Sequence, residues 1–169
     1  MTLSDGELRR HCERRMGALD RERQSWFQHW RELSDHILPR RGQFLSAAGQ
    51  SDRGRKVNGR ILDSTGTLAA RTLASGLMSG VTSPARPWFR LTVGDPALAQ
   101  AEGVRAWLDR VQEAMLRVFA RSNLYNALAT VYEELGVFGS ASLLVLEDDE
   151  EIVRAWPLTV GEYWLASSD

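Results

Sequence analysis

The sequence predicts a mainly helical α+β fold with a small antiparallel β-sheet toward the C-terminus. Over most of the chain before residue 140, apolar residues recur at the three- and four-residue spacing of an amphipathic helix. The pattern then changes to two short, continuous apolar runs, residues 142–146 and 152–156, on either side of the acidic run 147–151. Such runs around a polar turn are typical of a β-hairpin. The chain of 169 residues is long enough for one domain with a hydrophobic core.

Composition excludes several classes of protein. A hydrophobic fraction of 43% and a charged fraction of 25% are ordinary for a soluble protein. The single cysteine, Cys12, rules out an internal disulfide framework and fits a reducing compartment. The first ten residues lack the apolar core of a secretory signal. The longest weakly polar run, 73–81, is far shorter than the roughly 20 residues that cross a bilayer. We therefore expect no contact with a membrane.

Charge is distributed unevenly and suggests two domains. Residues 1–60 hold 13 Arg and Lys against 8 Asp and Glu, whereas residues 61–169 hold 8 against 14. Residues 1–60 are predicted to form an N-terminal helix and a basic, arginine-rich loop, and residues 61–169 a helical domain that ends in the hairpin. Since arginine binds carboxylates and phosphates with two parallel hydrogen bonds, the oppositely charged halves could meet head to tail between copies. Binding of DNA by the basic half is the alternative.

The N-terminal region is predicted to be one long helix over residues 3–37, ended by Pro39. The apolar residues that share one face of this helix are all in its C-terminal part. The residues of that face are Trp26, Phe27, Trp30, Leu33 and Ile37. His29, Glu32 and His36 share one side of this helix, but a metal would need a further ligand from elsewhere, so we interpret them as ordinary surface residues.

Residues 40–60 have no periodicity and are rich in glycine, serine and arginine, which predicts a loop. Its basic residues could contact phosphate or an acidic patch of a partner, although a solvated loop is the simpler interpretation. These candidate contact residues are Arg40, Arg41, Arg53, Arg55, Lys56 and Arg60.

The next segment, residues 61–91, predicts a helix followed by a proline corner. Asp63 or Ser64 can cap the helix, which should end between residues 80 and 83 because two prolines follow. Its large apolar residues lie near one face: Leu68, Leu73, Leu77 and Met78. Small residues between them, including Gly76, favour the close approach of another helix or of a neighbouring subunit. After the corner, Trp88 and Phe89 can anchor the loop by burying their rings.

Two more helices and three strands are predicted beyond this corner. Asp95 and Pro96 begin a helix that extends to about residue 120. Ser122 or Asn123 caps the second helix, which Gly136 and Gly139 close. Its predicted apolar face consists of Leu124, Leu128, Val131, Leu135 and Phe138. The hairpin follows, with its second strand ended by Pro157, and residues 160–165 are predicted as a third strand. The acidic turn could attract a divalent cation, but consecutive carboxylates more often repel each other into water.

The sequence contains no recognisable catalytic motif. The glycine-rich stretch 49–59 lacks the Gly-Lys-Ser/Thr ending of a phosphate-binding loop, and no serine lies in a nucleophile-elbow context. We therefore expect an interaction or structural protein without enzymatic activity, cofactor or metal.

Two segments resemble the head-to-tail connector, or portal, proteins of short-tailed bacteriophages. The first, residues 62–91, reads LDSTGTLAARTLASGLMSGVTSPARPWFRL, and the second, residues 122–145, reads SNLYNALATVYEELGVFGSASLLV. They match the small-residue helix, the Pro-Pro-x-x-x-Trp-Phe corner and the Ser-Asn-Phe-Tyr segment of that family, with Ser83, Leu124 and Ser140 as substitutions. The signature residues implied by the resemblance are Asp63, Gly76, Pro84, Pro87, Trp88, Phe89, Tyr125, Phe138 and Gly139.

The resemblance implies a portal wing-like fold and a structural function. Portal proteins form a homo-oligomeric, dodecameric ring at one capsid vertex, contact the terminase, the capsid and tail proteins, and let double-stranded DNA pass. This implies a place in the virion, and in the host cytoplasm during assembly. Family members are several hundred residues long, so the chain is expected to be an N-terminal part, whether a fragment, a prophage remnant or a truncation. The alternatives are a small DNA-binding or regulatory protein that uses residues 40–60, and a metal-dependent hydrolase that uses His29, Glu32 and His36.

Overall fold

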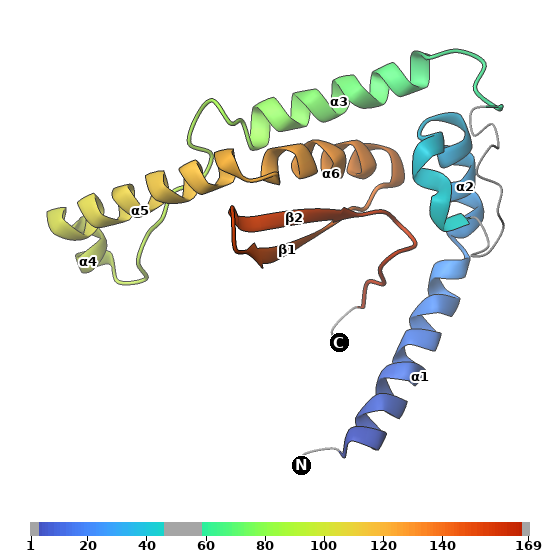
Figure 1. Ribbon diagram of the computed structural model, residues 1–169, viewed down its shortest axis with the longest axis horizontal. Helices are drawn as coiled ribbons and strands as arrows, with labels where there is room; N and C mark the ends of the chain where they lie inside the picture. Colours follow the sequence, from blue (N-terminus) through green and yellow to red (C-terminus); the bar gives the residue numbers. More distant parts are fainter. Residues whose placement is uncertain (1–3, 46–58, 167–169) are drawn as a thin grey trace. The chain divides into compact units, whose positions relative to one another are not determined.

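The computed structural model describes residues 4–45 and 59–166, which form two compact units (Figure 1). One unit contains the described residues up to Thr67 together with those from Thr159 onward, and the other contains residues 68–158. The expectation of a mainly helical α+β fold with a small antiparallel sheet near the C-terminus is confirmed. None of the helices in the described ranges combines the length and the apolar character that a bilayer crossing requires.

The first unit begins with two helices, α1 (Asp5–Gln24) and α2 (Phe27–His36), so the prediction of one continuous helix is wrong. The Ser25 hydroxyl donates to the Glu22 carbonyl oxygen at 3.0 Å. The Trp26 N–H bonds to the Arg23 oxygen, three residues back, at 2.9 Å. This side-chain competition for a helical carbonyl interrupts the ladder between the two helices. The predicted loop also begins differently, with a 3₁₀ helix, η1 (Pro39–Leu45).

Aromatic rings give α2 its packing, as the sequence predicts. Trp30 is buried, its ring stacks on Trp26 with centroids 6.5 Å apart, and Phe27 meets it edge to face at 5.8 Å. Such aromatic pairs contribute about 1 kcal/mol each beyond the area they bury.

The third strand predicted for residues 160–165 does not form. The structure describes all of these residues, and they make turns beside α1. The Glu162 N–H bonds to the Thr159 oxygen at 3.0 Å, and the Glu162 carboxylate accepts the Thr159 N–H at 2.8 Å. The Arg23 guanidinium donates to the carbonyl oxygens of Gly161 and Tyr163, at 2.8 and 3.0 Å. Because Arg23 binds these carbonyls, they are not available for strand pairing.

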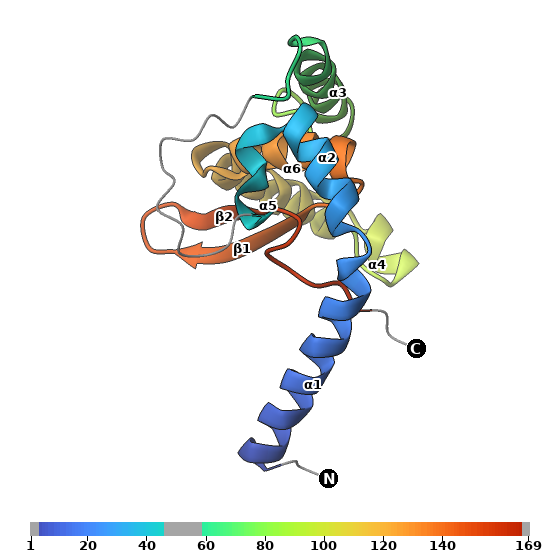
Figure 2. The ribbon, with the colours of Figure 1, turned by 90° about the vertical axis from the view of Figure 1, so that its right-hand side faces the viewer.

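In the second unit, three layers stack: α3 (Thr65–Val81), α6 (Leu124–Phe138) and the hairpin, with α5 (Glu102–Arg121) extending beyond α6 (Figures 1 and 2). The hairpin pairs β1 (Ser142–Asp148) with β2 (Ile152–Leu158) in antiparallel register, and Val145 lies opposite Ala155. Its inner face packs on α6. The buried cluster there consists of Leu124, Ala127 and Ala155, with Phe119, Leu128 and Leu143 at its margin. Pro157 lies within β2 rather than ending it, a position that proline tolerates on an edge strand.

Helix α3 begins and ends where the sequence predicts, but only part of the predicted apolar face is buried. Asp63 accepts the Thr65 N–H at 2.9 Å, and two prolines follow the C-terminus. Leu68 and Leu73 are about half exposed, whereas Ala70 and Ala74 are buried. Leu77 and Met78 are partly buried, and Leu73 lies against Gly136 of α6, where an added Cβ atom would be 2.8 Å from the Leu73 Cδ2 atom. The expected apolar face is therefore only partly right, because Leu68 is exposed and the two alanines are its most buried residues.

Two further predictions about helices need correction. Asp95 caps a helix as predicted, with its carboxylate 2.8 Å from the Ala97 nitrogen. That helix, α4 (Pro96–Gln100), ends at the extended residue Ala101, and α5 (Glu102–Arg121) begins anew. In α6, Leu135 of the predicted apolar face is exposed, whereas Tyr132 and Glu134 are buried.

Candidate functional site

The proline corner after α3 is held by a cluster of aromatic rings. Trp88 meets Phe89 edge to face with centroids 4.9 Å apart and stacks on Phe119 of α5 at 6.2 Å. Phe89 and Phe119 lie 6.0 Å apart. The predicted anchoring role of Trp88 and Phe89 is thus seen in their contacts, although both rings are only partly buried. Phe119 completes the cluster.

Two tyrosines of α6 bond to the same corner. The Trp88 indole N–H donates to the Tyr125 hydroxyl at 3.2 Å, and the hydroxyls of Thr82 and Tyr132 lie 3.0 Å apart in a buried pair. Tyr125 and Tyr132 are seven residues apart, so they lie on the same side of α6, two turns from one another. Residues 82–88 are therefore attached to α6 at both ends, which makes the corner a rigid element.

Asn123 joins α6 to the hairpin. Its side-chain nitrogen donates to the Ala155 carbonyl oxygen at 2.8 Å, and its side-chain oxygen accepts the Ala155 N–H at 2.8 Å. The amide thus satisfies the open edge of β2 as a further strand would. The sequence indicated Asn123 only as a possible cap. Asn123 does occupy the N-cap position of α6, but its side chain makes no capping bond, and the Ser122 hydroxyl accepts the Leu124 N–H at 3.2 Å.

The structure brings some signature residues together and leaves others apart. Trp88, Phe89 and Tyr125 belong to the corner cluster described above. Phe138 is buried at the end of α6, and Gly139 ends that helix in the left-handed conformation, with φ of 78°. A Cβ atom at Gly76 would meet nothing within 4 Å, so this glycine has no packing role in the described structure. Pro84 and Pro87 are exposed.

The candidate basic contact set is only partly visible. Arg53, Arg55 and Lys56 lie outside the described residues. Arg60 makes an ion pair with Asp35 at 3.0 Å, which occupies its guanidinium within the protein. Arg40 is exposed, and Arg41 is partly buried. Their contact with phosphate or with an acidic partner stays a prediction.

The acidic hairpin tip is organised by its own backbone. The Asp148 carboxylate accepts the N–H groups of Glu150 and Glu151 at 3.1 and 2.9 Å, and Arg154 lies 2.8 Å away. The hydrogen bond from the Glu151 N–H, followed by that from Glu150 and the charge of Arg154, lowers the pKa of Asp148. Within the described ranges, no three His, Cys, Asp or Glu side chains gather as metal ligands would.

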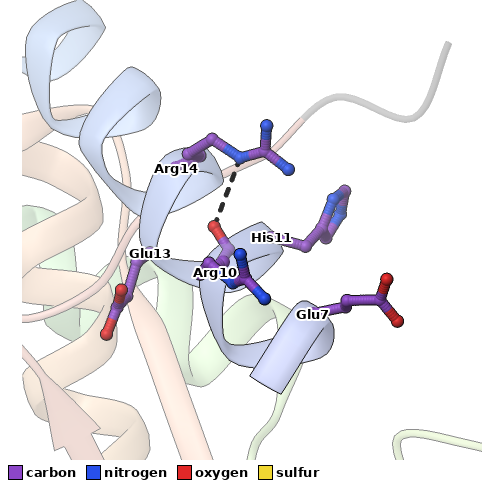
Figure 3. Close-up of a pocket in the computed structure, with 5 residues that line it drawn as sticks. All are labelled: Glu7, Arg10, His11, Glu13 and Arg14. Carbon is purple, nitrogen blue, oxygen red and sulfur yellow. Dashed lines mark hydrogen bonds between the residues drawn. The ribbon is translucent and has the colours of Figure 1, made fainter. Parts of the chain in front are cut away.

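Two hollows on the described surface lack paired reactive groups. One, of about 700 Å³, runs along α1, where charged side chains project into solvent and Arg14 donates to the Arg10 carbonyl oxygen at 3.3 Å (Figure 3). Its lining residues are Glu7, Arg10, His11, Glu13 and Arg14. A second, of about 350 Å³, lies between residues 90–92 and helices α4 and α5, with Arg90, Arg105 and Asp109 at its rim. The charged groups of both hollows lie on exposed surface, so neither resembles an enclosed catalytic site.

Comparison with known proteins decides the family. The sequence matches the model of the family described as bacteriophage head to tail connecting protein over residues 9–169. The chain belongs to this connector family. The match includes both segments that carry the resemblance, and therefore also the proline corner, its two tyrosines and Asn123.

Two relatives of the connector chain are named portal proteins. It is 51% identical over 155 residues to the probable portal protein of Bordetella phage BPP-1. It is 44% identical over 155 residues to the portal protein of Salmonella phage epsilon15. Each alignment covers 92% of this chain but 28% of the relative, so the chain spans less than a third of the length of these relatives.

Proposed function

We propose that this chain supplies the N-terminal part of a phage portal, the ring through which DNA enters and leaves the head. The family match over residues 9–169 carries the proposal. The described structure supports it because its elaborated features are packing devices: the ring cluster of the corner, the two tyrosine bonds and the Asn123 amide. Such devices hold shape, which is what a ring subunit under load requires.

In this proposal the contribution of the chain is geometric and electrostatic, without catalysis. Twelve copies of the full-length protein form a ring at one capsid vertex. Its partners are the terminase, which hydrolyses ATP, the capsid and tail proteins, and the double-stranded DNA in the channel. The protein is located in the virion, and in the host cytoplasm during assembly.

The basic segment is assigned a contact role within the same function. Arg40, Arg41 and the undescribed Arg53, Arg55 and Lys56 would meet DNA phosphates or acidic surfaces of a partner. Phosphate contacts weaken steeply with added salt. A free-standing DNA-binding or regulatory function has no support from the described residues, since Arg60 already pairs with Asp35.

A chimeric phage tests the proposal. The 155 matched residues of the epsilon15 portal protein would be replaced by the corresponding residues of this chain. We expect plaques and filled heads that contain the chimera. Within it, Trp88→Ala should reduce the titre of filled heads strongly, and Trp88→Phe, which keeps a ring but not the bond to Tyr125, should have an intermediate effect. A chimera that accumulates in folded form yet never enters heads would contradict the proposal.

A further inference from the structure

The outer face of the hairpin carries exposed apolar side chains beside one ion pair, Arg154 with Asp148 at 2.8 Å. On a β-strand alternate residues share a face, and the register places Leu144 opposite Trp156 and Leu146 opposite Arg154. Ala155, on the inner face, is buried against α6, so these residues point the other way. The exposed fractions of the large side chains on the outer face are Leu144 45%, Leu146 48%, Ile152 60% and Trp156 51%. Contiguous exposed apolar residues of this kind mark interaction surfaces.

Helix α1 also exposes its side chains along its whole length. It extends over 20 residues and contains no buried residue. A helix of this length is only marginally stable in water without tertiary contacts. Leu8, Cys12 and Met16 follow one another at four-residue spacing and form an exposed stripe. By the same periodicity, the charged residues of Figure 3 lie mainly on the other sides of α1.

The two surfaces match in length and in charge. From Leu8 to Met16 the stripe is about 12 Å long, and from Leu144 to the position opposite Ile152 the hairpin face extends about 13 Å. Exposed Arg9, which pairs with Glu13 at 2.9 Å, and exposed Arg15 flank the stripe on either side. The hairpin ends in the exposed acids Glu147, Asp149 and Glu150, which form no ion pair with any residue of the ranges 4–45 and 59–166. Opposite charges at the rim of an apolar contact favour one register of docking.

We propose that the α1 stripe of one copy docks on the outer hairpin face of the next copy. Each copy then offers one donor and one acceptor surface, so the contact is heterologous and, with the right rotation, closes into a ring. This inference rests on the proposed portal function and names a subunit contact for it.

Disulfide trapping tests the contact, because Cys12 is the only cysteine of the chain. In the Leu146→Cys variant of the whole chain, mild oxidation should link Cys12 of one copy to the introduced thiol of the next. A heterologous contact yields a ladder of covalent oligomers on a non-reducing gel. The same ladder should disappear after Cys12→Ser is added. Trp107→Cys, at an exposed position of α5, is the matched control and should give no ladder. Circular dichroism would verify that each variant is folded.

Three other outcomes of the disulfide trapping would contradict the proposed contact. Cross-linked monomers of altered mobility would show that α1 reaches the hairpin of its own chain. Dimers alone would show a symmetric contact, and yields equal to those of the Trp107→Cys control would show that the two surfaces do not meet. If the chimeric phage still forms plaques in these cases, only the contact is wrong. A ladder with an inactive chimera would instead contradict the portal function and leave the contact standing.

A charge exchange gives an independent measurement. Arg15→Glu should weaken self-association in sedimentation experiments by about fivefold, the upper range for an exposed ion pair. Adding Glu150→Arg should restore it. Arg14→Glu changes the same charge on another side of the helix and should have little effect (Figure 3). Equal effects of the Arg14 and Arg15 variants, or no restoration by the second change, would contradict the proposed register.

Discussion

At the scale of single residues, Asn123 carries more structure than its position beside a helix suggests. Its amide makes two hydrogen bonds of 2.8 Å to Ala155, a residue that is 1% exposed. Asn123→Ala leaves a backbone donor and acceptor of the core cluster without partners, so we expect a loss of about 2 kcal/mol in the free energy of unfolding. Urea unfolding measures it. Asn126→Ala, on the exposed surface of the same helix, should change it by less than about 0.5 kcal/mol. Equal losses in the two variants would show that the amide contributes nothing specific.

Asp148 makes the stability of the hairpin tip dependent on pH. The hydrogen bond from the Glu151 N–H, above all, lowers its pKa in the folded state. The unfolded chain, with a pKa of about 4, therefore binds the proton more readily. The resulting stabilisation is present above about pH 4 and is lost as the pH falls through the folded pKa.

Asp148→Asn, which keeps the oxygen acceptor but removes the charge, should lower the melting temperature at pH 7. The difference from the unchanged protein should shrink toward pH 3, as thermal unfolding followed by circular dichroism would show. Asp149→Asn, at an exposed position of the same turn, is the matched control and should lower the melting temperature at pH 7 by less than Asp148→Asn. A constant difference for Asp148→Asn at all pH values would refute the assignment.

At the scale of elements, the glycines of the helices separate into those that the backbone requires and those that it does not. Gly139 ends α6 with a φ of 78°, whereas Gly76 lies inside α3 with open space around it. We expect Gly76→Ala to stabilise the isolated chain by about 1 kcal/mol, through helix propensity. Gly139→Ala should destabilise it by about 1 kcal/mol, since alanine disfavours the left-handed region. Chemical unfolding of the two variants should therefore shift in opposite directions. Shifts of the same sign would mean that one of the two environments is wrongly described.

Element identity was more predictable than element boundaries. The periodicity of residues 65–81 and 124–138 and the two apolar runs of the hairpin are local signals, and they predicted α3, α6, β1 and β2. The interruptions at Ser25 and Ala101 depend on a single side-chain bond or on one extended residue, which no apolar pattern reports. The buried faces were harder still. In α3 the most buried residues are Ala70 and Ala74, which the spacing of the large apolar residues did not indicate.

At the scale of the whole molecule, long-range contacts of polar side chains were beyond sequence reasoning. Arg23 and Gly161 are 138 residues apart, and Asn123 and Ala155 are 32 apart. Nothing in the spacing of either pair indicates a bond. The family resemblance predicted the corner residues Trp88, Phe89 and Tyr125, but it did not predict how they contact each other. The chemistry of a structural site thus depends on partners that only the folded chain brings together.

Arg23 decides whether the residues after Thr159 stay attached to the N-terminal helices. Its guanidinium bonds to Gly161, Tyr163 and Asp20 and lies 4.5 Å from the ring centroid of Trp164. Lysine keeps the charge but lacks the planar fork that serves several acceptors at once. We expect Arg23→Lys to cost about 2 kcal/mol of local stability and to speed hydrogen exchange at the amides of residues 160–165. Arg21→Lys, on the exposed side of the same helix, should leave exchange there unchanged. If these amides exchange as slowly in both variants as in the unchanged protein, the segment is held by something other than the Arg23 guanidinium.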